Sequence, residues 1–166
     1  MTQRTAVILC GGSGRRLGQL GKKIPKSLVK IRQKPIIWFI LKSLKKNRFN
    51  HFILPIGYKG NQIKKYIRQN SEFSNYKIEL IDTGNKTSIA KRIFKIKKFI
   101  KSENFLILNG DSIFDTNLNH IFNIHIKKKY DISFISCEAK ADFGTIGTIN
   151  GKVINFQRNL NFGSVL

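Results

Sequence analysis

The glycine-rich stretch after the first apolar run contains the residue types that point most directly to chemistry. Residues 6–10 are apolar and predict a buried strand, three glycines follow within 11–14, and Arg15 and Arg16 come next. Glycines expose backbone N–H groups to phosphate oxygens because no side chain stands in the way. Arginines add fixed positive charge. The stretch predicts a loop that binds an anion, and a turn without a ligand is the alternative.

The loop does not match either of the common phosphate-binding motifs. The dinucleotide fingerprint requires GxGxxG, but Gly12 and Gly14 are followed by Gly18, one residue too late. The ATPase P-loop requires a hydroxyl residue after its Gly-Lys pair, and Gly21–Lys22 precedes another lysine. The anion is therefore not identified by these motifs.

Apolar runs typical of strands alternate with helical patterns along most of the chain. This order predicts an α/β fold of the Rossmann-like type, with a mixed, mostly parallel sheet and helices on both faces. Ligands of such folds bind at the carboxyl edge of the strands. The expected strands are 6–10, 51–56, 76–81, 104–109 and 131–136, and the expected helices are 34–46, 60–70, 87–100 and 117–129.

Several local signals refine these elements. Pro35 suits the first turn of its helix, and Thr87 is the expected cap of the helix that follows it. Trp38 lies on an apolar helix face and is expected in the core. Asn150–Gly151 between two short β runs predicts a hairpin. No linker or repeat is visible, so we expect a single domain spanning 1–166.

The composition is strongly basic, with 31 Lys and Arg against 9 Asp and Glu and a net charge of +22. Such a charge attracts nucleotides, nucleic acids or acidic membranes. The lysines are scattered, however, and the abundance of Lys, Ile and Asn also fits A/T-rich codons. A nucleic-acid partner is therefore a weaker expectation than a solvated basic surface.

The first apolar run is too short for a signal peptide or a membrane span, so we expect no membrane insertion and a cytoplasmic protein. Cys10 and Cys137 have no metal-binding spacing and are expected to be buried thiols. His51, His120 and His125 are also interpreted as structural, because their spacing does not place them together on one helix face.

Three motifs in order resemble the sugar-1-phosphate nucleotidylyltransferases. They are GGSGRRL at 11–17, PKSL at 25–28 and Gly110–Asp111 after a buried strand. The resemblance implies the nucleotide-diphospho-sugar transferase fold. It also implies a reaction in which a sugar 1-phosphate attacks the α-phosphorus of a nucleoside triphosphate and releases pyrophosphate, with Mg²⁺ as cofactor.

A finer resemblance concerns the base. The segment DTGNKTSIAKRI at 82–93 is similar to a stretch of glucose-1-phosphate cytidylyltransferases, although Ile89, Ala90 and Lys91 replace their Thr-Gly-Gly. In contrast, ILCGG and LNGDSIF look slightly more like heptose-1-phosphate guanylyltransferases. CTP is favoured, and GTP, UTP and dTTP stay open. A role in polysaccharide precursor synthesis is implied as well.

The resemblance assigns roles by position. Arg16 would hold the β- and γ-phosphates, Lys26 would lie between the reacting phosphates, and Asp111 would bind Mg²⁺; these three are the expected catalytic residues. Thr87 and Arg92 would contact the nucleotide, and Arg15 has no firm individual role. The full expected nucleotide-binding set is Leu9, Cys10, Gly11, Gly12, Ser13, Gly14, Arg15, Arg16, Lys26, Thr87, Arg92 and Gly110.

The sequence departs from the family near its end. Arg158, Asn159 and Leu160 stand where the family usually has Glu-Lys-Pro, and we expect the part that supplies a second metal-binding aspartate and much of the sugar pocket to be missing. Three hypotheses follow. They are an active enzyme, completed by a partner or by homo-oligomerisation, a truncated relative that only binds nucleotide, and a basic nucleic-acid-binding protein.

Overall fold

The structure is a computed structural model, and it describes residues 3–14, 18–136, 139–140, 145–157 and 161–162. The chain forms two compact units, Met1–Ile124 and His125–Leu166. The predicted site residues Arg15 and Arg16, as well as Cys137 and the segment 158–160, lie outside the described residues.

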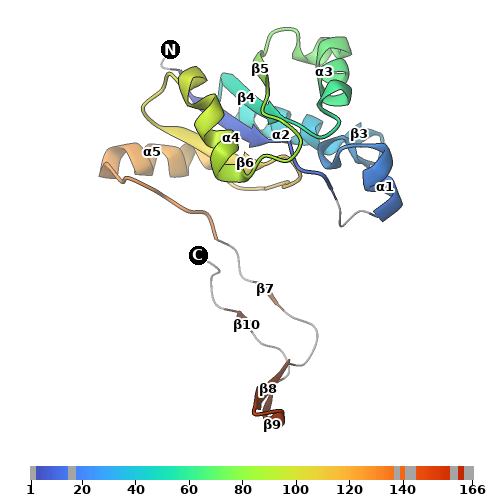
Figure 1. The fold of residues 1–166 in the computed structure, drawn as a ribbon. Coiled ribbons are helices and arrows are strands. Elements are labelled where there is room, and N and C mark those ends of the chain that lie inside the picture. The colour runs from blue at the N-terminus through green and yellow to red at the C-terminus, as the bar shows by residue number, and fades with distance from the viewer. Residues whose placement is uncertain (1–2, 15–17, 137–138, 141–144, 158–160, 163–166) are drawn as a thin grey trace. The chain divides into compact units, whose positions relative to one another are not determined.

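A four-stranded parallel sheet forms the centre of the first unit (Figure 1). Its strands are β1 (Thr5–Leu9), β4 (His51–Ile56), β5 (Lys77–Asp82) and β6 (Phe105–Asn109), in the order β5-β4-β1-β6. All three pairings are parallel. The predicted strands are confirmed here, and their carboxyl ends meet at one edge of the sheet.

Helices α2 (Ile36–Lys46), α3 (Gly60–Gln69) and α5 (Leu118–Lys128) pack on one face of this sheet. Side chains alternate along a strand, so Ala6 and Ile8 point to this face. There they join one buried cluster that also contains Ile37, Leu41 and Leu44 of α2, Ile63 of α3 and Phe122 of α5. The periodic apolar faces predicted for these helices are thus the surfaces that they bury.

The other face is covered by α4 (Ile89–Ile96) and the short 3₁₀ helix η4 (Lys97–Phe99). Val7 of β1 and Ile53 of β4 pack there against Ile96, all fully buried. The sheet is therefore covered on both faces, as predicted from the alternating pattern.

The cap of α4 differs from the prediction. Ser88, not Thr87, is the N-cap, and its Oγ accepts a hydrogen bond from the Lys91 N–H at 3.4 Å. The Thr87 hydroxyl instead donates to the Thr83 carbonyl at 2.6 Å. Two adjacent hydroxyl residues both suit the position, and the nearby carbonyl decides between them.

Between β1 and α2 the chain forms short elements that shape one side of the later site. They are α1 (Gly18–Lys23), η2 (Lys26–Leu28) and the two-stranded pair β2 (Lys30–Ile31) and β3 (Lys34–Pro35). The sequence predicts Pro35 in the first turn of α2, but in the structure Pro35 is the N-cap, directly before that turn. Trp38 is only partly buried, and its Nε1 donates to Glu72 of η3 (Ser71–Phe73) at 3.0 Å.

The strand β6 is less buried than the sequence predicts. Within the described residues it pairs only with β1. Leu106 and Leu108 pack against the core, while Phe105 and Ile107 on the opposite face are 36% and 39% exposed. An apolar run predicts a strand but not its lateral place in the sheet, and an edge strand buries fewer of its side chains.

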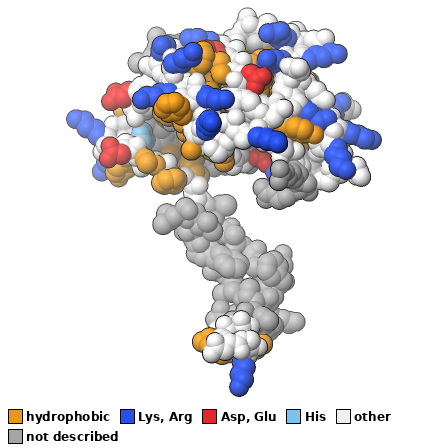
Figure 2. Space-filling view, in the orientation of Figure 1, with side chains coloured by type: hydrophobic (Ala, Val, Ile, Leu, Met, Phe, Trp, Pro, Cys, Tyr) orange, Lys and Arg blue, Asp and Glu red, His pale blue; other side chains and the backbone are white. Residues whose placement is uncertain are grey.

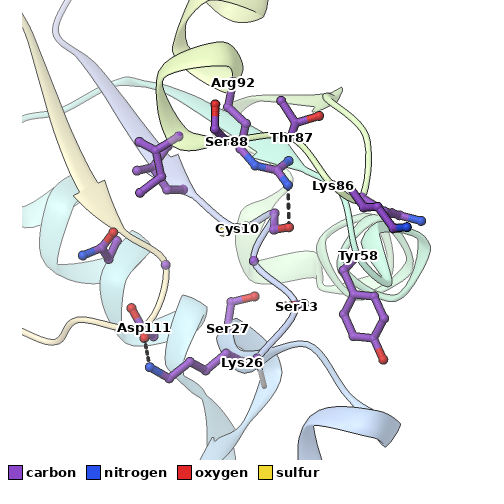
Figure 3. Close-up of a pocket in the computed structure, with 18 residues that line it drawn as sticks. Cys10, Ser13, Lys26, Ser27, Tyr58, Lys86, Thr87, Ser88, Arg92 and Asp111 are labelled. Atoms are coloured by element: carbon purple, nitrogen blue, oxygen red, sulfur yellow. Dashed lines mark hydrogen bonds and ion pairs between the residues drawn. The ribbon is translucent and has the colours of Figure 1, made fainter. Parts of the chain in front are cut away.

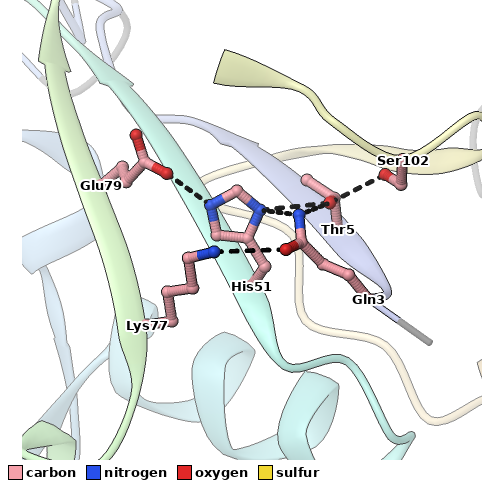
Figure 4. A network of polar contacts seen from close by, with 6 residues as sticks. All are labelled: Gln3, Thr5, His51, Lys77, Glu79 and Ser102. Atoms are coloured by element: carbon pink, nitrogen blue, oxygen red, sulfur yellow. Dashed lines mark hydrogen bonds and ion pairs between the residues drawn. The ribbon is translucent and has the colours of Figure 1, made fainter. Parts of the chain in front are cut away.

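Polar contacts hold the amino edge of the sheet (Figure 4). The His51 ring is 1% exposed, and its Nε2 lies 2.6 Å from Glu79 Oε1 on the neighbouring strand. Its Nδ1 lies 3.2 Å from Thr5 Oγ1, which accepts a hydrogen bond from Ser102 Oγ at 2.8 Å. His51 is thus a structural residue, as interpreted from the sequence.

The second unit contains two small antiparallel pairs, β7 (Ala139–Lys140) with β10 (Asn161–Phe162) and β8 (Thr145–Ile149) with β9 (Lys152–Gln157). Asn150 and Gly151 have φ values of 49° and 76°, the positive pair that a type I′ turn requires. The predicted hairpin is confirmed.

The prediction of a strand at 131–136 is wrong. These residues form no strand, and no strand in the described part of the chain forms a ladder with them. Ile132 and Phe134 are 69% and 74% exposed. A strand requires a hydrogen-bonding neighbour, which an alternating pattern alone does not provide.

Basic side chains are spread over the visible face of the first unit rather than gathered in one patch (Figure 2). This distribution fits a solvated basic surface. Among the described residues, no helix combines the length and apolar character needed to cross a membrane.

Candidate active site

A cavity of about 1070 Å³ opens at the carboxyl edge of the central sheet (Figure 3). Its wall is formed by the loops that follow β1, β4, β5 and β6 and by the start of η2. The structure brings together every described residue of the predicted site. These are Leu9, Cys10, Gly11, Gly12, Ser13, Gly14, Lys26, Thr87, Arg92, Gly110 and Asp111.

Lys26 and Asp111 form an ion pair at this cavity. Lys26 begins η2, with Pro25 as its N-cap in extended conformation, and Asp111 follows the end of β6. Their side chains are 40% and 23% exposed, so both reach solvent inside the cavity. Lys26 and Asp111, far apart in the sequence, thus bring opposite charges into contact at the cavity wall.

Arg92 is the most buried charged residue of the site, at 4% exposure. Its Nη2 donates to the Gly11 carbonyl at 2.7 Å, and its Nη1 donates to the Ile56 carbonyl at 3.2 Å and to the Thr83 hydroxyl. Burial lowers the pKa of this guanidinium, but an arginine stays charged at neutral pH. Arg92 therefore joins the carboxyl ends of β1, β4 and β5.

Gly11 lies directly against this guanidinium. A Cβ built on Gly11 would overlap the Cζ and Nη1 atoms of Arg92. In contrast, a Cβ on Gly12 would meet no atom within 4 Å. The first glycine of the loop is therefore required by packing, while the second leaves backbone open to the cavity.

The loop between β5 and α4 is fixed by hydrogen bonds within it and to β4 and α4. The Thr83 hydroxyl donates to the Ile56 carbonyl at 2.7 Å, and the Thr83 carbonyl accepts from Thr87 Oγ1 at 2.6 Å and from Lys95 Nζ at 2.8 Å. Gly84 has a φ of 91°, which favours glycine. Thr87 lines the cavity, with its hydroxyl proton used within the loop.

Two small side chains close the inner wall. Cys10 is 5% exposed, and burial raises the pKa of its thiol to about 12, so the thiol is neutral at physiological pH. Ser27 is 3% exposed, and its Oγ has no hydrogen-bond partner among the described residues. Cys10 is thus a packing residue and not a nucleophile, since the thiolate is the reactive form.

The donor set of the cavity fits a phosphate-bound Mg²⁺. Asp111 is the one carboxylate among the described residues that line it. No cluster of three or more His, Cys, Asp or Glu residues occurs in the described ranges. Mg²⁺ commonly binds through one or two carboxylates together with substrate phosphates and water, and a single aspartate is sufficient for that mode.

Sequence reasoning missed seven lining residues. Ser27 lies in PKSL and Asn109 in LNGDSIF, two motifs already quoted, and Tyr58 belongs to the loop after β4. The other four belong to the loop after β5 and the start of α4. They are Asn85, Lys86, Ser88 and Ile89. Their place in the 82–93 motif was the signal that could have found them.

The wall is basic where described, with Lys26, Lys86 and Arg92 against Asp111. Backbone groups of the glycine loop border the same space. The arrangement can hold a polyanion near one carboxylate, and it offers no histidine and no ionised thiol as a nucleophile among the described residues.

Comparison with known proteins agrees with this arrangement. The model of the nucleotidyl transferase family matches residues 5–157. A probable glucose-1-phosphate cytidylyltransferase of Bacillus subtilis is 32% identical over 180 residues, covering 97% of this chain and 71% of that protein. A D-glycero-α-D-manno-heptose 1-phosphate guanylyltransferase of Campylobacter jejuni is 37% identical over 147 residues, covering 87% of this chain and 62% of that protein.

Solved structures share the fold. HddC from Yersinia pseudotuberculosis, complexed with GMP-PN, superposes with a TM-score of 0.66 at 22% identity, covering 96% of this chain and 74% of that one. A UDP-glucose pyrophosphorylase complexed with UDP-glucose gives a TM-score of 0.65 at 14% identity, covering 96% and 70%. The predicted fold type is confirmed. The family match over residues 5–157 and the 32% identity to the Bacillus subtilis protein show that this chain belongs to the nucleotidyl transferase family of enzymes.

Proposed function

We propose that this chain transfers a nucleoside monophosphate from a nucleoside triphosphate, with CTP favoured, to a sugar 1-phosphate. The products are a nucleoside diphosphate sugar and pyrophosphate, and we place the reaction in the supply of cell-surface polysaccharide precursors. One observation carries the proposal. The glycine loop 11–14, Lys26 and Asp111 meet at a single cavity whose described basic side chains suit a polyphosphate.

The reaction needs no protein nucleophile, because a phosphate oxygen of the sugar 1-phosphate attacks the α-phosphorus directly. The chain must instead hold two polyanions in line and stabilise the charge that develops. Backbone N–H groups of 11–14 would bind the triphosphate. Lys26 would lie against the reacting phosphates, and Arg16, where the family motif has its arginine, would hold the outer ones.

A bound Mg²⁺ would neutralise phosphate oxygens and polarise the α-phosphorus. Asp111 would hold it, in line with the donor set of the cavity. Arg92 keeps the Gly11 carbonyl in place and so orients the loop that receives the triphosphate.

The preference for CTP rests on the 82–93 segment, whose loop lines the cavity. The relatives support both bases, because a cytidylyltransferase and a guanylyltransferase match at similar identity. GTP is therefore the second candidate nucleotide.

Pyrophosphate release tests the proposal. The purified chain is incubated with Mg²⁺, CTP or GTP, and either glucose 1-phosphate or a heptose 1-phosphate. We expect release with one nucleotide, and a loss of about 100-fold or more in Lys26→Met because a preorganised charge is removed. Lys22→Met is the matched control, since Lys22 is an exposed lysine of α1; it should keep wild-type activity.

Other outcomes have defined meanings. Triphosphate binding without pyrophosphate release would support a relative that only binds nucleotide. Nucleic-acid binding that falls steeply with salt and is unchanged in Lys26→Met would support a polyanion-binding protein instead. Sedimentation of the active sample tests whether a homo-oligomer completes the site.

A further inference from the structure

Lys26 and Asp111 form an ion pair with each other, although the proposed reaction assigns them to different ligands. Lys26, assigned to phosphate, forms its ion pair with Asp111, assigned to the divalent cation (Figure 3). A triphosphate that takes Lys26 and a cation that takes Asp111 must each replace this contact. The ion pair is therefore part of the binding equilibrium of both ligands.

The surroundings of the ion pair favour its replacement by the two ligands. Among the described residues that line the cavity, Asp111 is the only anionic partner for Lys26. Both side chains are partly exposed, and ion pairs of that kind contribute little net stability because water and salt compete with them. The pair can open without unfolding any element around it.

We propose that the Lys26–Asp111 ion pair couples the binding of the nucleoside triphosphate to that of the divalent cation. Either ligand alone must open the pair, and the other then finds its own partner already released. The coupling is reciprocal, so each ligand raises the affinity for the other. This inference rests on the proposed function and adds to it the mutual dependence of nucleotide binding and metal binding.

The proposal gives Asp111→Asn opposite effects under two conditions. Without a divalent cation, Lys26 is no longer held by a carboxylate, so a triphosphate binds more tightly than in the wild type. With Mg²⁺ present, the cation loses its carboxylate ligand, so the triphosphate binds less tightly. A residue that only bound metal would produce the second effect alone.

Simple repulsion is the competing explanation, because removing any negative charge from the cavity favours an anion. A double-mutant cycle separates the two. If Asp111 acts by holding Lys26, its removal has no effect once Lys26 is replaced by methionine. If it acts by repelling phosphate, its removal has the same effect with or without Lys26.

The experiment is calorimetric titration with CTP and with GTP, in EDTA and in Mg²⁺ at equal ionic strength. The variants are Asp111→Asn, Lys26→Met, the double variant, and Asp115→Asn as an exposed carboxylate close in sequence. In EDTA we expect Asp111→Asn to bind the triphosphate about 2- to 5-fold more tightly than wild type, the range of an ion pair of this exposure. In the Lys26→Met background that gain should vanish, and Asp115→Asn should match wild type.

Three results would overturn the inference. An equal gain in both backgrounds identifies repulsion, a gain of the same size in Asp115→Asn identifies a general charge effect, and weaker binding of Asp111→Asn in EDTA excludes a competing pair. Each of these leaves the proposed function standing if the wild type releases pyrophosphate. Absence of triphosphate binding in the wild type and in every variant would reject both.

Discussion

The guanidinium of Arg92 donates a hydrogen bond to the carbonyl of Gly11 at 2.7 Å, joining the helix α4 to the glycine loop. The same side chain also bonds to Ile56 and Thr83. Arg92 was predicted as a nucleotide contact, and it does line the cavity. Its guanidinium also bonds to three protein oxygens around the glycine loop, so Arg92 positions that loop.

Replacing Arg92 should therefore weaken the fold as well as the site. Arg92→Met leaves buried acceptors without their donors, and we expect the free energy of unfolding to fall by about 2–4 kcal/mol. Arg92→Lys should restore only part of the lost free energy of unfolding, because an ammonium lacks the planar guanidinium that reaches several acceptors. Urea denaturation measures both, with the exposed Lys91→Met as control. Unchanged stability with lost triphosphate binding would assign Arg92 to the nucleotide alone.

The two adjacent glycines of the loop should respond differently to alanine. At Gly11 the new methyl group overlaps the Arg92 guanidinium, and we expect a loss of about 1–3 kcal/mol in the free energy of unfolding. At Gly12 the methyl group meets no atom within 4 Å. Gly12→Ala should keep the stability of the wild type, and thermal denaturation of the pair decides. Equal losses at both positions would contradict the packing role of Gly11.

The Cys10 thiol should react slowly with alkylating reagents well above neutral pH. Burial raises its pKa to about 12, so at pH 9 only about one thiol in a thousand is ionised. In a Cys137→Ser background, the rate of iodoacetamide labelling should stay far below that of the urea-unfolded chain from pH 7 to 9. A rate that rises with an apparent pKa of 8 to 9, as in a free thiol, would show that Cys10 is not buried.

Glu72 should make stability depend on acid pH. Its carboxylate accepts from Lys34 Nζ at 2.9 Å, from Lys42 Nζ at 2.9 Å and from Trp38 Nε1 at 3.0 Å. The bonds from Lys34, Lys42 and Trp38 lower its pKa to about 2, from an ordinary 4.5. The stabilisation is complete above pH 4.5 and is lost as the pH falls toward 2, because the unfolded chain takes up the proton first.

Glu72→Gln should remove that part of the acid dependence. The measurement is the urea midpoint between pH 5 and pH 2, followed by fluorescence of Trp38, the one tryptophan. The exposed Glu103→Gln serves as the control. A midpoint that falls equally in wild type and Glu72→Gln would show that these hydrogen bonds contribute nothing.

The strands of the central sheet were predictable because short apolar runs bounded by polar turns fit few structures other than buried strands. Their lateral order was not, since the pattern of 104–109 is the same for a central and an edge strand. The strand predicted at 131–136 does not form for a related reason, because the alternation of apolar and polar residues does not determine a pairing partner.

The site divides in a similar way. The meeting of Lys26 with Asp111 could be expected from motifs that resemble a known family, and the structure confirms their proximity. The burial of Arg92 could not, because a charge in an amphipathic pattern is ordinarily solvated. Only the fold shows that three strand ends converge on it. The choice of Ser88 over Thr87 as cap likewise depends on where the Thr83 carbonyl lies.

The central place of β1 determines when the site can form during synthesis. Thr5 pairs with His51 on one side and with Phe105 on the other, so β1 gains both of its neighbours only after β4 and β6 have been synthesised. Asp111 follows the later of these strands. Until β6 is synthesised, one edge of β1 therefore lacks its neighbour, and unpaired strand edges of this kind promote aggregation. The cavity that Asp111 lines can therefore form only after β6 has paired with β1.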